Sequence, residues 1–560
     1  MRLCILSVYI VLSVKLSFGE ILRIGETTRW QTLEPVTARL PVEKRISSLL
    51  YQRMFLYDKT VFEVEHIGLK PNLVEVIKAD TIGGRYQLVF KNNSQLGPKD
   101  LLYTIKIMNH NKTIYHQPMF CPYWDLSKKF FYYSESQPNT AGIEMNNGVS
   151  LIRANFHLVK NNMFGEYVKK NLDRNVWIDN DKTKEIINNA STGPYKIELI
   201  EKNYLLLKSQ NISGNIDKIQ IDIHDERTLM DRLKKHRRDE FSIDIIPELS
   251  IKEAAQFEDP GFEGRYKTST PTSNNFWVIG FNYHATHVED VRNLFHKKIF
   301  RQYIGLAIYP KKLFEYSLRM NDEYGSLLCG PLYRRPGLEE IDNYIEFCAA
   351  TRFIRGVESQ NIGRYMSFLK KHIQVIKHVN SNTDGALLYH LRPVKFLLLY
   401  PMFGIMAAEI QNIAMTIKDR LREKGIWLIT SGERSRYNWE KRIKYKDFDL
   451  ILYKGFYDYS YDITDYFEKD NPLNLCGLPS DNKKKIHELI KSYHSTDQNE
   501  DKSQILMKLN ALLSNETIGI FLWSLKYKTV YRSVLKFGPG QTGINDIDFF
   551  QGIDNWNISE

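Results

Sequence analysis

A strand–helix–strand pattern in the last third of the chain constrains the fold more than any other feature. Residues 394–400 form a short apolar run that ends at Pro401, as a buried strand does. The following segment carries apolar residues at helical spacing, namely Ile410, Ile413, Ala414, Ile417 and Leu421. Two more apolar runs follow, at 426–429 and 448–452. Strands that alternate with helices predict an α/β lobe with a largely parallel sheet.

Other elements are predicted from the same periodicities. Residues 85–90 alternate polar and apolar side chains, as a half-buried strand does, and residues 276–282 are dense enough in large apolar side chains for a fully buried strand. Apolar residues at helical spacing predict a helix within 46–57. Shorter strands are predicted at 196–200, 204–208 and 216–223.

Composition places the chain among ordinary globular proteins. Its 560 residues are 43% hydrophobic and 26% charged, which excludes a disordered or membrane-embedded chain. The net charge is +11, but Lys and Arg are mixed with acids along the sequence. The most basic stretch, 232–238, is flanked by Asp231 and Asp239, so it indicates a solvated helix face or else an anion-binding patch. No nucleic-acid partner is predicted.

The N-terminus reads as an export signal. A charged start at Arg2 precedes an apolar run over 3–14, and small residues follow at Ser17 and Gly19. The run is shorter than the ~20 residues that span a bilayer. We therefore predict a signal peptide at 1–19 that is cleaved to leave a soluble protein, with an uncleaved anchor as the alternative.

The cysteines give little guidance. Five occur and none forms a Cys-x-x-Cys pair, so zinc ribbons and thioredoxin-type motifs find no support. Sequence proximity suggests a disulfide between Cys329 and Cys348, and buried free thiols are an equal alternative.

Signatures of catalysis are missing from the sequence. It contains no Gly-x-Ser-x-Gly, no His-Glu-x-x-His, no phosphate-binding loop and no dinucleotide fingerprint. The cluster His224-Asp225-Glu226 follows an alternating strand, so its neighbours would face opposite ways. An exposed strand end is favoured over a metal or acid–base site. Neither an enzyme nor a cofactor is therefore predicted.

Taken in order, several segments resemble the family 5 extracellular solute-binding proteins, which include periplasmic peptide-binding proteins. The segment Gly193-Pro194-Tyr195 is similar to the family's "G-T-G-P-Y" turn, and Gly455-Phe456 followed by Asp458 is similar to its "G-W…D-Y" segment. The other matching segments are 22–25, 32–35, 68–75, 98–104, 280–282, 423–426 and 518–522. The resemblance spans the whole chain after residue 19.

The chain also departs from the family pattern. The usual "F-x-D-G" is replaced near 91–94, the "R-Q-A" helix start appears as Arg292-Asn293-Leu294, and Ile463 stands where a Pro is usual. A diverged member of the family can differ from its relatives in ligand.

The resemblance implies an α/β fold of two lobes, the type II periplasmic binding protein fold with an extra domain, with mixed sheets and flanking helices. Lobe I would be built from three segments, with lobe II and the extra domain inserted between them. The implied boundaries are 1–19 for the signal peptide, 20–46, 186–275 and 495–560 for lobe I, 47–185 for the extra domain and 276–494 for lobe II.

The resemblance also implies a function. Such a protein binds peptides between its lobes, without a metal or cofactor, and delivers them in the periplasm to the membrane permease of an ABC transporter, as a monomer. The implied ligand contacts are Trp30, Gly455, Phe456, Tyr457 and Asp458. For Trp30 and the other aromatic residues, packing in the lobe core is the alternative. The same fold could instead bind nickel, haem or an oligosaccharide, or serve as a chaperone-like interaction protein.

Overall fold

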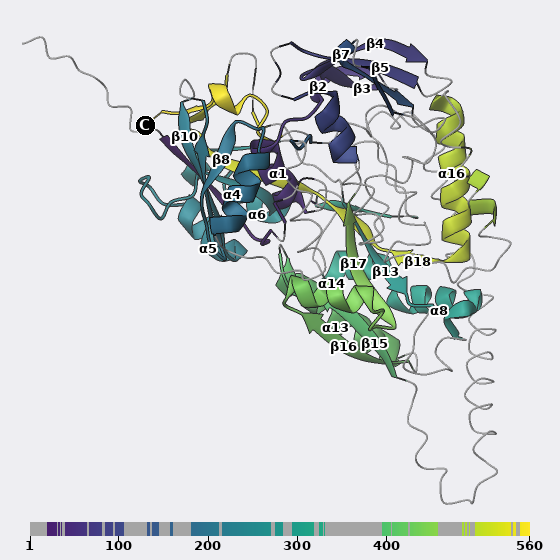
Figure 1. The fold of residues 1–560 in the computed structure, drawn as a ribbon. Helices are drawn as coiled ribbons and strands as arrows, with labels where there is room; N and C mark the ends of the chain where they lie inside the picture. Colours follow the sequence, from purple (N-terminus) through teal and green to yellow (C-terminus); the bar gives the residue numbers. More distant parts are fainter. Residues whose placement is uncertain are drawn as a thin grey trace, which may run out of the picture.

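The structure is a computed structural model. It describes residues 20–30, 32–33, 35, 38, 40–63, 66–80, 85–92, 94, 96–105, 131–134, 137–144, 157–160, 181–211, 215–269, 275–283, 294–317, 324–328, 330, 395–404, 406–423, 426–456, 484–486, 488–489, 492, 499–538, 541, 543–544 and 549–559. In Figure 1 these residues form two bodies built on separate sheets, which we call the first body and the second body, and a smaller sheet beside the first body.

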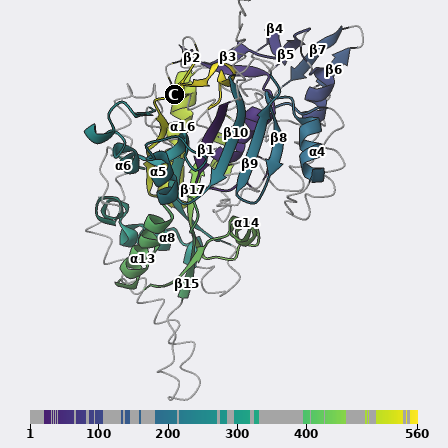
Figure 2. The same cartoon turned by 90° about the vertical axis from the view of Figure 1, so that its left-hand side faces the viewer.

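The first body is built on a mixed seven-stranded sheet (Figure 2). In spatial order its strands are β12 (Tyr266–Thr268), β20 (Tyr527–Arg532), β11 (Ile245–Ser250), β1 (Glu20–Glu26), β10 (Ile216–Ile223), β9 (Tyr204–Ser209) and β8 (Tyr195–Ile200). Strand β1 runs parallel to β10 and β11, and the outer pairs are antiparallel. The helices of this body are α1 (Pro41–Leu50), α4 (Asp181–Ala190), α5 (Glu226–Leu233) and α6 (Ile251–Ala255). The strands predicted at 196–200, 204–208 and 216–223 correspond to β8, β9 and β10, and they form one edge of the sheet.

Helix α1 begins and ends earlier than the sequence predicts. Pro41 suits the first helical turn, and the Glu43 carboxylate accepts the Leu40 backbone N–H at 2.9 Å. At the other end, the Gly193 N–H donates to the Leu50 carbonyl at 2.8 Å. A Cβ on Gly193 would lie 2.3 Å from the Leu49 carbonyl oxygen, so only glycine fits there. The Gly-Pro-Tyr turn thus ends the helix, and the predicted helix over 46–57 is wrong beyond residue 50.

The second body is built on a five-stranded sheet. In spatial order its strands are β16 (Trp427–Glu433), β15 (Lys395–Pro401), β17 (Leu450–Phe456), β13 (Asn275–Phe281) and β18 (Gly519–Phe521). Strand β15 runs parallel to β16 and β17, whereas β13 is antiparallel to its neighbours. The helices α8 (Lys298–Ile308), α13 (Ala407–Glu423), α14 (Arg436–Lys444) and α16 (Asn499–Glu516) also belong to this part of the chain. The predicted parallel unit is confirmed, and β13 makes the whole sheet mixed.

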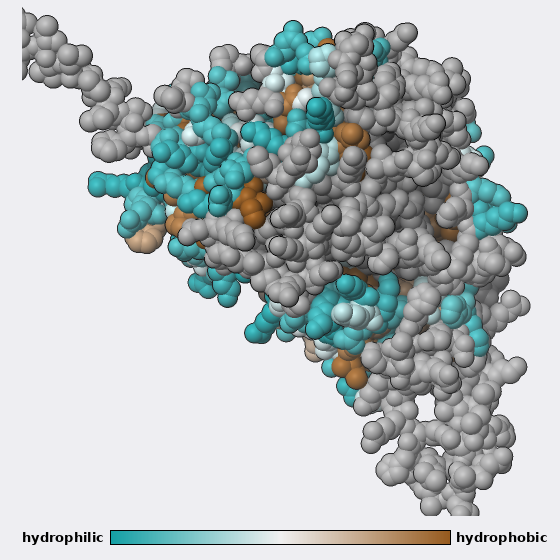
Figure 3. All heavy atoms as spheres, viewed as in Figure 1, coloured by the Kyte–Doolittle hydropathy of each residue, from teal (hydrophilic) through white to brown (hydrophobic). Residues whose placement is uncertain are grey.

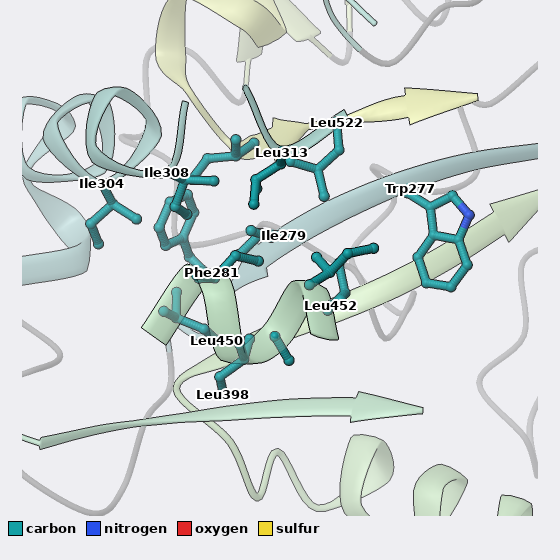
Figure 4. Packing of buried hydrophobic residues seen from close by; sticks show 14 of the residues in the cluster. Trp277, Ile279, Phe281, Ile304, Ile308, Leu313, Leu398, Leu450, Leu452 and Leu522 are labelled. Atoms are coloured by element: carbon teal, nitrogen blue, oxygen red, sulfur yellow. The ribbon is translucent and has the colours of Figure 1, made fainter. Parts of the chain in front are cut away.

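The predicted stripe of α13 is confirmed as the side that packs on this sheet. Its five apolar residues are all buried, and they share one core with strands β13, β15 and β17. Figure 4 shows this core, in which Ile279 and Phe281 of β13 lie near Leu450 and Leu452 of β17. Burying apolar area at about 25 cal/mol per Å² makes such a core the main stabilising term of the body.

A four-stranded antiparallel sheet lies beside the first body (Figure 1). Its strands are β4 (Val74–Asp80), β5 (Arg85–Phe90), β7 (Gln137–Glu144) and β6 (Phe131–Ser134), and the pair β2 (Phe55–Glu63) and β3 (His66–Pro71) lies next to it. The alternation over 85–90 is confirmed as β5. All six strands fall within 47–185, the range predicted for an extra domain.

The chain returns to the first body later than predicted. Strand β18, at the start of the return, pairs with β13 of the second body, and β19 (Trp523–Leu525) pairs with β14 (Gly325–Leu327). Only β20 joins the seven-stranded sheet. The predicted lobe I segment 495–560 therefore contributes its first strands to the second body.

On the face seen in Figure 3, the described surface is mostly hydrophilic. In Figure 3 the hydrophobic residues that reach the surface on that face are scattered among polar ones. Exposed large apolar side chains include Phe241, Trp427 and Tyr445, from different elements. Within the described ranges, no helix is long and apolar enough to cross a membrane.

Candidate binding site between the two bodies

The parallel strands of both sheets end at the same junction. In the first body, β1 ends at Glu26 and its parallel neighbour β10 ends at Ile223. In the second body, β15 and its parallel neighbours β16 and β17 end at Pro401, Glu433 and Phe456. Open α/β sheets bind ligands outside the carboxyl ends of their strands. The segments that follow these strands are therefore the place to look for a site.

Two contacts show that the carboxyl ends of the two sheets face each other. Glu226, just after β10, accepts a hydrogen bond from the backbone N–H of Met406, which precedes α13. A Cβ on Gly404, just after β15, would lie 2.9 Å from the Thr28 hydroxyl, just after β1. We use the name rim for Thr28, Glu226, Gly404 and Met406, together with Glu409 in the first turn of α13.

Among the described residues, the charged groups that act on Glu226 at the rim are acidic. Burial, together with the charges of Glu253 and Glu409, raises the pKa of Glu226 to about 7 against the opposing hydrogen bond from Met406. One oxygen of the Glu226 carboxyl is buried without a hydrogen-bond partner among the described residues. The contact between the bodies at the rim is therefore favoured when Glu226 is protonated.

The bodies are also joined by strands that pass from one sheet to the other. Asn275 begins β13 and is fully buried, and its side-chain amide donates to the Leu525 carbonyl at 2.6 Å. The Leu525 N–H donates back to the Asn275 side-chain oxygen at 3.1 Å. This two-way pairing ties the start of β13 to the end of β19, where the chain leaves for β20. We use the name crossing for Asn275 and Leu525, together with the nearby residues Trp277, Lys454 and Tyr527.

A buried ion-pair network lies on the first-body side of the crossing. The Arg45 guanidinium donates two hydrogen bonds, each 2.8 Å long, to the two oxygens of Glu26. It also lies 3.7 Å from the Glu248 carboxylate. Burial opposes the charge of Arg45, but Glu26 and Glu248 together raise its pKa. Burial raises the pKa of Glu26, and the bidentate pairing with Arg45 opposes that shift.

Tyr527 connects this network to the second body. It belongs to β20 of the first sheet, yet its ring packs in the core of the second body. The Lys454 ammonium lies 4.4 Å from the centre of the Tyr527 ring. Burial raises the pKa of the Tyr527 phenol, Lys454 and Trp277 lower it, and Glu248 raises it. Charges from both bodies therefore act on one buried hydroxyl.

The comparisons with known proteins show which fold this geometry belongs to. No protein-family model matches the sequence, and no curated protein matches it. Solved structures do match, over nearly the whole chain. The oligopeptide-binding protein AppA from Bacillus subtilis, solved with a nonapeptide, has a TM-score of 0.66 and 15% identity, covering 97% of this chain and 99% of that one.

Two further structures show the same architecture. The pheromone receptor PrgZ, whose mode of peptide binding was determined, has a TM-score of 0.68 and 15% identity over 97% of this chain and 100% of its own. DppA from Helicobacter pylori, in complex with the peptide STSA, has a TM-score of 0.65 and 12% identity over 97% and 99%. The chain has the periplasmic binding protein fold. The fold class predicted from the resemblance is thereby confirmed.

Within this binding-protein fold, Trp30 lies in the core of the first body. Its side chain is 2% exposed and packs among apolar residues that include Leu22 and Ile24 of β1. A side chain this buried offers little surface to a ligand. This burial matches the alternative given for Trp30 from the sequence, namely packing in the core of the lobe.

The predicted segment 455–458 begins at the crossing. Gly455 is buried opposite Phe276, and a Cβ there would lie 2.1 Å from the Phe276 ring, so the neighbouring strand needs glycine at this position. Phe456 ends β17 and pairs with Asn275. Tyr457 and Asp458 lie outside the described residues, as do the predicted signal peptide and all five cysteines.

The remaining sequence candidates have structural roles in the described part of the fold. The backbone N–H of His224 donates to the Glu26 carbonyl. The Asp225 carboxylate caps α5 by accepting the Thr228 backbone N–H at 3.0 Å. In the basic stretch, Arg238 pairs with buried Asp244 at 3.0 Å, so it supports the fold of the first body. No group of His, Cys, Asp or Glu suited to a metal ion occurs among the described residues.

Sequence reasoning missed the residues that join the two bodies. The sequence marks Glu226 only as part of a strand-end cluster, and no motif marks Arg45, Lys454 or Tyr527. Their partners lie far away in the sequence, so no local spacing connects them. A buried-charge signal was available only for Arg45, which shares the otherwise apolar side of α1 with Ile46 and Leu49.

Proposed function

We propose that this chain is the extracytoplasmic solute-binding component of an ABC-type importer, and that it binds peptides between its two bodies. The observation that carries the proposal is that the carboxyl ends of the two sheets face each other at the rim. A solute held there would contact both bodies at once. Support also comes from the fold, which this chain has in common with the peptide-bound AppA and DppA structures.

The geometry supports a hinged mode of binding. In the described part of the structure, the backbone itself passes between the two sheets at the crossing. At the rim, by contrast, side chains and loops make the contact. A rotation about the crossing would separate Glu226 from Met406 without breaking a strand, and the reverse motion would enclose a solute. The membrane permease would recognise the closed shape. Residues 1–19 would direct export, and the protein would act as a monomer.

We also propose cargo contacts in the segment 455–458. The backbone of Gly455 and Phe456 leads directly from the crossing into this segment, and the family resemblance assigns the ligand backbone to it. Asp458 would pair with the amino terminus of a peptide, because a carboxylate and an ammonium attract strongly where water is excluded.

Native mass spectrometry of the exported protein, purified without denaturant, tests the function. We expect a heterogeneous set of short peptides to be released under mild conditions. A single metal complex, haem or sugar would replace the cargo while keeping the transport role, because the fold is also that of NikZ from Campylobacter jejuni bound to Ni(L-His). A protein that carries nothing, and that no peptide pool stabilises thermally, would favour a chaperone-like interaction protein.

The role of Asp458 is tested by Asp458→Asn, which replaces an ion pair by a neutral contact. We expect weaker binding of peptides with a free amino terminus, and no change for the same peptides after amino-terminal acetylation. Equal affinity of the variant and the unaltered protein for free-amino peptides would reject the role and direct attention to Asp462.

A further inference from the structure

Three lysines form a row across one face of the first-body sheet. Lys208 of β9 lies directly opposite Lys196 of β8 on one side and Lys218 of β10 on the other. Residues directly opposite each other have Cβ atoms about 5 Å apart, and like charges in such positions destabilise a sheet. A sheet that keeps three ammonium groups in line therefore loses stability, and an anion from outside would offset that loss.

Nearby acids act on only one end of this row. The Lys218 ammonium donates to the Glu198 carboxylate at 2.9 Å, and the charge of Asp217 also acts on it. Among the described residues, neither Lys196 nor Lys208 has an ion-pair partner. Lys208 is exposed and Lys196 is half-buried. The other end of the row is therefore open to an anion from solution.

The row lies on the face of the sheet opposite the apolar core. Ile197 and Leu207, which alternate with the lysines along β8 and β9, are buried in that core with residues of α1 and α4. Helix α5 is on the lysine side but packs over β11 and β1, where its Leu229 lies against Gly25. Figure 2 shows α5 at the β1 side of the sheet, with β9 and β8 beyond β10. The part of this face at β8 and β9 thus lies away from α5, and Lys208 is exposed there.

Apolar side chains accompany the lysines on this face. A β-bulge between Ile197 and Leu199 places Leu199 directly opposite Leu206 of β9, in the row next to the lysines. Leu199 is 42% exposed and Leu206 is half-buried. A bilayer surface presents phosphates above acyl chains, so a sheet face that combines ammonium groups with exposed apolar side chains matches it in both respects.

We propose that this face of β8, β9 and β10 docks on an anionic lipid bilayer, with the three lysines at the level of the lipid phosphates. The inference goes beyond the proposed function and does not depend on the cargo. A lysine near an anionic membrane strengthens binding about fivefold, so three of them give a reversible attachment. Such an attachment would hold the protein beside the membrane that contains the proposed permease, so that its search for the permease takes place along a surface.

Flotation of the exported protein with lipid vesicles tests the surface. We expect it to float with phosphatidylcholine vesicles that contain about one-third phosphatidylglycerol, and not with pure phosphatidylcholine. Raising the salt from about 0.1 M to about 1 M should release it, because the range of charge interactions falls from about 10 Å to about 3 Å. The double variant Lys196→Gln with Lys208→Gln should bind the anionic vesicles at least about tenfold more weakly.

Matched controls separate the row from the overall positive charge of the protein. Lys252→Gln with Lys267→Gln removes the same charge from exposed lysines of α6 and of β12, the edge strand farthest from β8. This variant should bind anionic vesicles within about twofold of the unaltered protein. Lys196→Arg with Lys208→Arg keeps the charge of the row and should keep full binding. Circular dichroism checks that every variant is folded.

The other outcomes are also decisive. Equal losses in the two glutamine double variants would show attraction by net charge alone and overturn the docking face. Equal flotation with neutral and anionic vesicles would overturn it as well, because the lysines would then contribute nothing. If the protein floats with neither kind of vesicle but binds polyglutamate through Lys196 and Lys208, the row serves an acidic peptide and the lipid proposal fails. None of these results affects the proposed binding of peptides between the two bodies.

Discussion

The two bodies meet at the crossing and at the rim, and these two places differ in how their charged and polar side chains are paired. At the crossing, Arg45 lies between two carboxylates and the Asn275 amide is paired on both sides. At the rim, Glu226 meets a single backbone N–H and two more acids. Among the described residues, the acids at the crossing therefore share a basic partner, whereas the charges that act on Glu226 at the rim are acidic. The proposed hinge motion requires this difference, because the connection has to persist while the contact opens and closes.

The largest expected effect comes from breaking the compensation at the crossing. Arg45→Met leaves Glu26 buried without its partner, and we expect the free energy of unfolding to fall by about 3–5 kcal/mol. Urea denaturation followed by circular dichroism measures it. Lys218→Met, which removes a more exposed pair with Glu198, is the control and should cost at most about 1 kcal/mol. Equal effects of the two variants would show that the buried pair stabilises the protein no more than an exposed one.

The next effect concerns the neutral pairing at the crossing. Asn275→Ala leaves the N–H and the carbonyl of Leu525 buried and unpaired, and should lower the free energy of unfolding by about 2–4 kcal/mol. Asn139→Ala, which breaks an exposed side-chain pair with Asn92, should change it by less than about 0.5 kcal/mol. A loss below about 1 kcal/mol for Asn275→Ala would mean that the crossing is held by its apolar contacts instead.

The rim should respond to pH, and the sign follows from Glu226. Its pKa is about 7 where the bodies touch, against an ordinary value of 4.5, so the touching state binds the proton more tightly. The contact is therefore strongest below about pH 4.5 and weakens as the pH rises to 7. Small-angle X-ray scattering without ligand should show a larger radius of gyration at pH 8 than at pH 5.

Glu226→Gln sharpens this pH test, because an amide keeps the size of the side chain and does not titrate. We expect the variant to lose most of the change in radius between pH 5 and pH 8. Asp239→Asn, at an exposed acid of the same body, should behave like the unaltered protein. A variant that keeps the full change would assign the pH response to other groups.

The smallest expected effect lies in the backbone of the rim. Gly404 has a φ of +80°, and its Cβ would lie close to Thr28. Gly404→Ala should therefore lower the free energy of unfolding by about 1 kcal/mol. Gly261→Ala, with no atom near its Cβ, is the matched control and should be close to neutral. No difference between the two variants in thermal unfolding would show that this loop adjusts freely.

Part of the fold could be predicted because it depends on neighbours in sequence. The stripe of α13 and the strands at 85–90 and 216–223 appear where their periodicities place them. The helix predicted over 46–57 failed at its end for a tertiary reason. Gly193, more than a hundred residues away, donates to Leu50 and ends the helix there.

The sequence by itself determined the elements, because a side chain's burial in a helix or strand follows from its spacing along the chain. From the order of motifs it also indicated the two-lobed fold. Only the tertiary structure decided which residues join the bodies. Asn275 and Leu525 are 250 positions apart, and Glu226 meets Met406 across the two sheets. Such pairs leave no local pattern, because their contact exists only once both sheets have formed and the chain has crossed between them.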